Sequence, residues 1–161
     1  MPDAQEFILG EFQRTFDERY RLAIPAELVA ALGGEERELI LAKERPGCLS
    51  LWNAANWQSK LTAGVQLVEA KMRAGKLEGK WEQVQLLGRL LSSRHRTVQL
   101  AARGRLIIPE GFREFLQAEA GSDVMLIGAA VCVEIWNPRS WMSELEQRMP
   151  KFRRLFDRLS S

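Results

Sequence analysis

The chain has 161 residues, 46% of them hydrophobic and 27% charged, and a formal net charge of +2 at pH 7. This composition is typical of a soluble globular protein with one domain or two small ones, and it excludes a mostly disordered chain. Two cysteines and one histidine are too few for a disulfide framework or a closed zinc site, and no apolar run approaches the roughly 20 residues of a membrane helix.

The charge is unevenly distributed along the chain. Residues 1–50 carry six basic and ten acidic side chains, whereas residues 51–161 carry seventeen basic and eleven acidic ones. A net charge this small does not by itself indicate a nucleic-acid-binding protein. The N-terminal segment lacks the basic start and long apolar core of a signal peptide, so we expect a cytoplasmic protein without a membrane partner.

The first part of the chain predicts four short strands and one short helix. Pro25 suits the first turn of this helix, Gly33 and Gly34 end it, and Asn53 is a typical N-cap for a further helix. We expect strands at residues 12–16, 22–24, 38–42 and 48–52, and the helix at residues 26–32.

A segment without strand signals follows, over about residues 54–93. Its apolar residues recur at helical spacing in two stretches, separated by Gly75 and Gly79, which predicts two helices. The earlier pattern then returns, and Asn137 is again a typical N-cap. A final helix is predicted at residues 141–159, interrupted at Pro150. We expect the returning strands at residues 97–101, 106–108, 123–127 and 131–136, and their helix at residues 110–116.

The two strand-rich parts are copies of one unit, offset by 84 residues. The sequence Arg-x-Arg-Leu-x-Ile-Pro occurs at residues 19–25 and again at residues 103–109. A unit this small buries little apolar surface alone, so we expect both copies to share one core, with strands exchanged in a pseudo-twofold barrel. The identical pairs include uncommon residue types: Cys48 and Cys132, Trp52 and Trp136, Trp57 and Trp141.

An arginine doublet stands directly before a short apolar strand in each copy. Residues 17–21 read Asp-Glu-Arg-Tyr-Arg, and residues 101–105 read Ala-Ala-Arg-Gly-Arg. Residues i and i+2 of an extended segment point to the same face, so the doublets can place four guanidinium groups on one surface. Guanidinium groups suit the phosphates and guanine edges of DNA. The structural alternative is an ion pair between Asp17 and Arg21 that fixes the turn, and both roles are compatible.

The candidate DNA-binding residues follow from these doublets. Arg14, Arg94 and Arg96 flank the same region and are expected to add contacts to the DNA backbone. The principal contacts are assigned to Arg19, Arg21, Arg103 and Arg105, and the structuring of the turn to Asp17.

The sequence holds no constellation typical of an enzyme. It has no glycine-rich phosphate loop and no His-Glu-x-x-His motif, so we expect no cofactor, no metal and no small-molecule substrate. His95, between two arginines, is interpreted as an exposed residue at a strand edge. Cys48 and Cys132 are expected to be small buried hydrophobes, and the tryptophans at equivalent repeat positions are expected to lie in the core.

The sequence resembles the MraZ family, in the SpoVT/AbrB-like group, over about residues 8–148. The resemblance rests on Gly10-Glu11-Phe12, on Asp17-x-Arg19-x-Arg21-Leu22-x-Ile24-Pro25, on Leu28 to Leu32, and on residues 103–109 and 133–136 in the second copy. It implies an α+β fold of two tandem swapped-hairpin half-domains that form one barrel-like unit with peripheral helices. The family motif places its arginine at Arg21 and Arg105; Ala101 replaces the motif aspartate, and Tyr20 replaces the usual glycine.

The resemblance also implies a function. MraZ proteins are sequence-specific transcriptional regulators of the division and cell-wall gene cluster, which bind repeated promoter boxes of double-stranded DNA as ring-shaped homo-oligomers at the nucleoid. The alternative class is a protein-interaction module, either antitoxin-like or an assembly scaffold. We expect residues 8–56 and 94–141 to form the half-domains, residues 57–93 the helical insert and residues 142–161 a helical tail.

Overall fold

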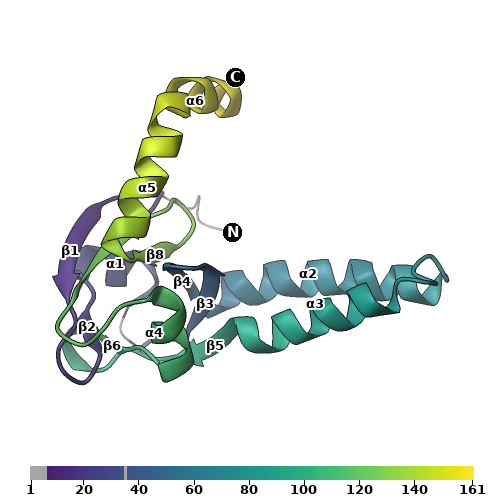
Figure 1. The fold of residues 1–161 in the computed structure, drawn as a ribbon, viewed down its shortest axis with the longest axis horizontal. Helices are drawn as coiled ribbons and strands as arrows, with labels where there is room; N and C mark the ends of the chain where they lie inside the picture. The colour runs from purple at the N-terminus through teal and green to yellow at the C-terminus, as the bar shows by residue number, and fades with distance from the viewer. Residues whose placement is uncertain (1–6, 35) are drawn as a thin grey trace.

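The computed structural model describes residues 7–34 and 36–161, in which one succession of elements occurs twice (Figure 1). The first copy comprises β1 (Glu11–Thr15), β2 (Arg21–Ala23), α1 (Ala26–Ala31), β3 (Leu39–Arg45) and β4 (Cys48–Asn53). The second comprises β5 (His95–Val98), β6 (Arg105–Ile107), α4 (Glu110–Leu116), β7 (Asp123–Gly128) and β8 (Val133–Trp136), with a 3₁₀ turn, η1 (Ala102–Gly104), before β6. The other elements are α2 (Ala54–Arg73) and α3 (Trp81–Arg94) between the copies, and α5 (Pro138–Arg148), η2 (Met149–Lys151) and α6 (Phe152–Ser160) after them. The predicted strands and helices are therefore confirmed, with small shifts of their ends.

The two copies complete each other's sheets. A six-stranded antiparallel sheet has the order β1-β7-β8-β4-β3-β5, and β2 pairs with β6 in a separate two-stranded ribbon. The pairs β1–β7, β3–β5, β4–β8 and β2–β6 each join one copy to the other. The expected barrel-like unit does not close into a barrel, because β1 and β5 are the two open edges of the sheet in the described chain. The ribbon strands are three residues long and pair with each other, so they do not bridge these edges.

A pseudo-twofold axis relates the copies. Residues that are 84 positions apart face each other at two places: Ser50 opposite Glu134 in β4 and β8, and Leu22 opposite Leu106 in the ribbon. The sheet order shows the same symmetry. Replacing each strand by its equivalent in the other copy gives β5-β3-β4-β8-β7-β1, which is the observed order read from the opposite edge. The axis therefore passes through the centre of the sheet and the centre of the ribbon.

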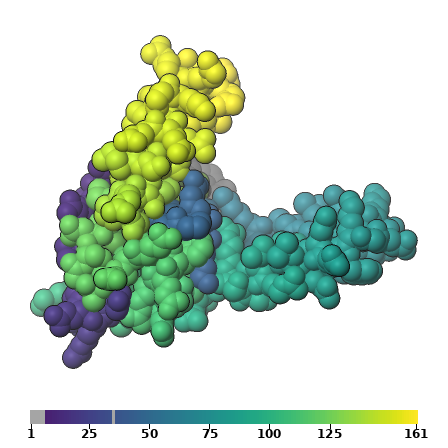
Figure 2. Space-filling view, in the orientation of Figure 1, coloured from purple at the N-terminus to yellow at the C-terminus, as the bar shows by residue number. Residues whose placement is uncertain are grey.

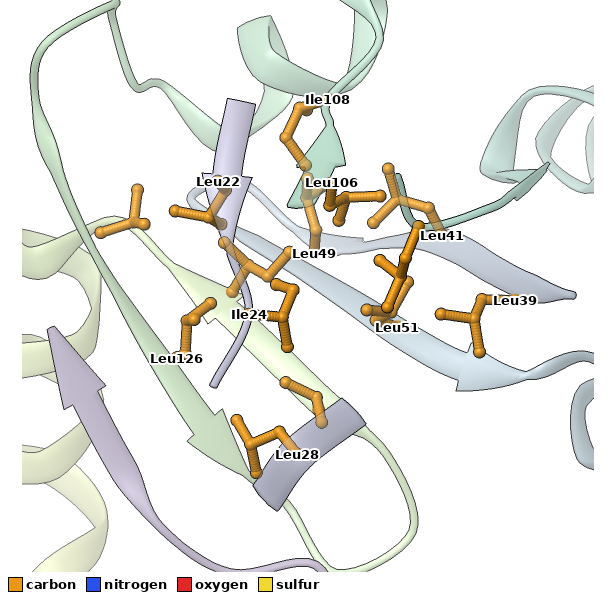
Figure 3. Packing of buried hydrophobic residues seen from close by; sticks show 14 of the residues in the cluster. Leu22, Ile24, Leu28, Leu39, Leu41, Leu49, Leu51, Leu106, Ile108 and Leu126 are labelled. Carbon is orange, nitrogen blue, oxygen red and sulfur yellow. The ribbon is translucent and has the colours of Figure 1, made fainter. Parts of the chain in front are cut away.

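The hydrophobic core is shared by the copies. Leu22 and Leu106 of the ribbon belong to the same buried cluster as Leu41, Leu49 and Leu51 of the sheet (Figure 3), and each is at most 1% exposed. Burying one such side chain contributes roughly 1.5–3 kcal/mol, so the shared core supplies stability that neither small copy could provide alone. The short helices α1 and α4 add Leu28, Val29, Phe112 and Leu116 to this cluster, and Leu32, directly after α1, also belongs to it.

Equivalent asparagines begin the helices that leave the sheet, as the sequence predicts. The Oδ1 of Asn53 accepts hydrogen bonds from the backbone N–H groups of Ala55 at 3.0 Å and Asn56 at 3.3 Å, at the start of α2. The Oδ1 of Asn137 accepts them from Arg139 at 3.0 Å and from Ser140 at 3.5 Å, at the start of α5. These side chains satisfy donors that have no partner within their helix.

Two helical projections extend from the body in different directions (Figures 1 and 2). We call α2 and α3 the helical hairpin, and α5 to α6 the C-terminal arm. No helix in the described part of the chain is both long enough and apolar enough to cross a membrane. Large exposed apolar side chains lie on both projections: Leu67, Trp81, Leu86, Leu87 and Leu90 on the hairpin, and Met142, Met149, Phe152, Leu155, Phe156 and Leu159 on the arm.

Candidate nucleic-acid interface

One arginine of each doublet, Arg21 or Arg105, begins a strand of the β2–β6 ribbon. In its register, Arg21 lies opposite Ile107, and Ala23 lies opposite Arg105. The central residue of each strand points into the core, so these four neighbours point outward. Diagonal neighbours on one face of an antiparallel pair have Cα atoms about 7–8 Å apart. Arg21 and Arg105 therefore share the outward face of one short ribbon.

The first turn, residues 17–21, is organised by the carboxylate of Asp17. Its Oδ1 accepts hydrogen bonds from the backbone N–H groups of Arg19 at 2.8 Å and Arg21 at 2.9 Å, and its Oδ2 accepts one from the Arg21 Nε at 2.6 Å. The pKa of Asp17 lies below its ordinary value, mainly because its carboxylate accepts the hydrogen bond from the Arg21 N–H. The Arg21 side chain and the Arg19 N–H lower this pKa further, whereas desolvation raises it by a smaller amount. The expected ion pair is thus present, and the exposed side chain of Arg19 remains available to a ligand.

The second turn, residues 101–105, is held by its backbone instead. The N–H of Ala101 donates to the Arg105 carbonyl oxygen at 2.8 Å, and the N–H of Arg105 donates to the Ala101 carbonyl oxygen at 3.3 Å. The Nε of Arg105 donates to the carbonyl oxygen of Ala102 at 3.3 Å, while the side chain of Arg103 is exposed. Among the described residues, no carboxylate is paired with the arginine side chains of the second turn as Asp17 is with Arg21.

Tyr20 and Gly104 occupy equivalent positions and both have a left-handed backbone, with φ values of 57° and 67°. A Cβ on Gly104 would lie 3.1 Å from the Cγ2 of Val29, a tight contact that favours glycine. Arg113 in α4 of the second copy is the equivalent of Val29 in α1 of the first, and its guanidinium carbon lies 4.0 Å from the centroid of the Tyr20 ring. A left-handed non-glycine residue costs of order 1–3 kcal/mol, and this cation–π contact offsets part of that cost.

The three flanking arginines lie on other elements. Arg14 on β1 donates from Nη1 to the carbonyl oxygen of Gln13 at 2.8 Å, and Arg96 is on β5 at the opposite edge of the sheet. Arg94 donates to both carboxylate oxygens of Glu44 at 3.3 Å, so its charge is used within the protein. The register of the ribbon brings together Arg21 and Arg105 but does not include these three residues.

Ile107 is a surface residue at this site that we did not single out from the sequence. It lies on the outward face of the ribbon, 56% exposed, directly across from Arg21. The signal was available: Leu106 and Ile108 are both core residues, so strand alternation directs the isoleucine between them outward.

The remaining chemistry-bearing residues are structural. Burial raises the pKa of the Cys132 thiol to about 12 and raises that of Cys48 as well, as expected of small buried hydrophobes. His95 is at the sheet edge, but it is half-buried rather than exposed, because its ring packs against Trp57 with centroids 5.3 Å apart. Among the described residues, no three His, Cys, Asp or Glu side chains are grouped so as to hold a metal ion.

Comparison with known proteins assigns the family. The family model described as "MraZ protein, putative antitoxin-like" matches residues 7–70 and 93–159. The chain belongs to the MraZ family. A protein named Transcriptional regulator MraZ from Roseiflexus castenholzii is 31% identical over 137 residues, which cover 85% of each chain. One of the same name from Legionella pneumophila strain Corby is 31% identical over 83% of this chain and 81% of its own. A MraZ of the same name from Syntrophomonas wolfei is 28% identical over 94% of this chain and 95% of its own.

Proposed function

We propose that this MraZ chain is a sequence-specific DNA-binding transcriptional regulator, and that the β2–β6 ribbon with its two turns contacts the DNA. One observation carries the proposal: Arg21 and Arg105, from different copies, share the outward face of a two-stranded antiparallel ribbon. The major groove of B-DNA accommodates a two-stranded β-ribbon, and arginine contributes both phosphate and guanine contacts. The printed names of its relatives, which call them transcriptional regulators, support the same function.

The finer proposal follows the family resemblance. We propose that the targets are repeated boxes in the promoter of a division and cell-wall gene cluster, which would place the protein in the cytoplasm, at the nucleoid. Residues 8–56 and 94–141 are the proposed swapped-hairpin half-domains, with residues 57–93 as insert and 142–161 as tail. The strand pairs that join the two copies support this organisation.

We further propose that the protein acts as a ring-shaped homo-oligomer. Exposed apolar side chains on both projections support association, because large apolar patches on a soluble protein usually mark an interface. Several ribbons held in one assembly would gain avidity on repeated boxes without any new contact. Light scattering after gel filtration tests this, with Phe156→Glu on the arm expected to reduce the assembled mass.

A gel-shift experiment on the DNA upstream of the protein's own gene tests DNA binding. Arg21→Ala and Arg105→Ala are each expected to remove most binding, and the affinity of the parent is expected to fall steeply with salt. Arg73→Ala, which removes the same charge from the far end of α2, is the matched control and is expected to bind normally. If both ribbon variants bind as tightly as the parent, the ribbon is not the DNA-contacting surface.

The second candidate is a protein-interaction module. It is favoured by one observation: the C-terminal arm leaves Phe152, Phe156 and Leu159 more than half exposed. Recovery of one stoichiometric protein partner with the chain, and of no DNA, would support this function over the first.

A further inference from the structure

We infer that the two turns have different tasks on DNA: the first turn reads bases and the second neutralises phosphates. The inference rests on the proposed DNA binding and concerns the features in which the two copies differ. Arg21 and Ile107 form the base-reading pair, and Arg103 and Arg105 form the phosphate-binding pair.

The charges of the two turns differ. Residues 17–21 contain Asp, Glu and two Arg, for a net charge of zero, whereas residues 101–105 contain two Arg and no acidic residue, for a net charge of +2. The Arg21 Nε is paired with Asp17 at 2.6 Å, which cancels most of its long-range attraction for a phosphate. The sequence-independent, salt-sensitive part of the binding therefore belongs mainly to the second turn.

The first turn is the more rigidly built. The carboxylate of Asp17 binds the backbone at Arg19 and Arg21 and also the Nε of Arg21, so it fixes both the turn and the side chain. Tyr20 is held between Arg113, at 4.0 Å, and the ring of Phe16, with centroids 5.8 Å apart. A bidentate contact to a guanine needs the guanidinium fork in a defined plane. Because the ion pair occupies Nε, it presets the fork and leaves the terminal Nη groups to bind the base edge.

The neighbour across the ribbon strengthens this assignment. Arg21 lies opposite the half-exposed side chain of Ile107, which can pack against a thymine methyl beside the guanine. Arg105 lies opposite Ala23, which offers little surface to a base. The base-reading chemistry is thus concentrated at one end of the ribbon.

The second turn suits a contact that tolerates varied geometry. In the described part of the chain, its arginine side chains are held by a single bond, from the Arg105 Nε to the Ala102 carbonyl oxygen at 3.3 Å, and Arg103 is exposed. Phosphate contacts set position rather than sequence and do not require a preset fork. Loss of the motif aspartate at position 101 is consistent with this role, because a carboxylate there would repel phosphate.

The inference is tested with the full-length chain, by selecting bound sequences from a random duplex library and then titrating salt on the selected and scrambled duplexes. Arg21→Lys keeps the charge and loses the fork, so discrimination at one base pair is expected to fall by about 5- to 150-fold with an unchanged salt slope. Arg105→Ala is expected to keep the selected sequence, and to make the slope of log K against log[salt] less steep by about 0.9 for each Arg105 that contacts DNA.

Asp17→Asn separates structure from charge. It retains an oxygen acceptor for the two backbone N–H groups, so the fold is expected to persist by circular dichroism. Base discrimination is expected to fall while affinity for scrambled DNA rises, because an acidic charge has been removed. The opposite variant, Ala101→Asp, is expected to weaken binding to every duplex.

The outcomes distinguish the two levels of the proposal. If Arg21→Lys and Arg105→Lys lower discrimination equally, or if Arg105→Ala alters the selected sequence, the division of tasks is wrong while DNA binding stands. If the parent selects no sequence and shows no salt-dependent binding, the proposed function itself is wrong.

Discussion

Leu106→Ala tests whether the two copies share one core. Leu106 is 1% exposed and lies opposite the fully buried Leu22, at the point where the pseudo-twofold axis crosses the ribbon. Truncating a buried leucine to alanine typically costs about 2–5 kcal/mol, a large part of the roughly 5–15 kcal/mol that stabilises a domain. The neighbouring Ile107→Ala is the matched control, because its side chain is 56% exposed and surface changes usually stay within about 0.5 kcal/mol.

The assay is guanidinium unfolding at one protein concentration, followed by tryptophan fluorescence and circular dichroism. We expect Leu106→Ala to lower the midpoint of a single transition reported equally by both signals. Leu22→Ala should have a similar effect, and the double variant should deviate from the sum by about 0.5–3 kcal/mol because the side chains are in contact. Two separate transitions, or an effect of Leu106→Ala no larger than that of Ile107→Ala, would refute a shared core.

Three further predictions concern single sites. Burial, and to a lesser extent Glu44, raises the pKa of Glu134 above its ordinary value of 4.5, so the folded state loses stability as pH rises through the raised pKa. Glu134→Gln should therefore be more stable than the parent at neutral pH. In unfolding titrations, this difference in stability should disappear near pH 4.5. Cys48 and Cys132 should stay unreactive to a thiol reagent at pH 8 until denaturant is added, since burial raises the pKa of both thiols; fast labelling of the native protein would contradict this. Gly104→Ala should destabilise the fold by about 1–3 kcal/mol, because the residue has φ 67° and its new Cβ would lie 3.1 Å from the carbonyl oxygen of Ile24. An unchanged melting temperature would contradict this prediction.

The duplication explains how such a short ribbon is formed and held in place. Each copy supplies one three-residue strand, and neither strand has another partner in the described chain. The N–H of Ile108 donates to the Tyr20 carbonyl oxygen at 3.2 Å, and the N–H of Ile24 donates to the Gly104 carbonyl oxygen at 2.9 Å. These two equivalent bonds tie each turn to the other copy, so changes in one turn are expected to affect the opposite strand.

Local features were determined by the sequence alone. The repeat and its element order, the N-caps Asn53 and Asn137, and the ion pair between Asp17 and Arg21 were all predicted. The element order, the N-caps and the ion pair depend on residues within a few positions of one another, where hydrogen-bonding geometry and strand or helix periodicity leave few alternatives. The repeat is visible because identical residues recur at a fixed offset of 84 positions. Family membership also followed from these short motifs, because their order and duplication are specific.

The tertiary structure decided what depends on contacts between distant segments. It showed an open sheet instead of a closed barrel, placed Ile107 opposite Arg21, and set Arg113 against Tyr20. It also half-buried His95 against Trp57, where the sequence suggested exposure. Strand partners and stacking contacts of this kind arise from segments some 40 to 90 residues apart, whose pairing is fixed by the packing of the whole core rather than by local pattern. The sequence therefore identified the two arginine doublets as candidates, and only the fold decided that Arg21 and Arg105 share one face and that the two turns differ in how they hold their arginines.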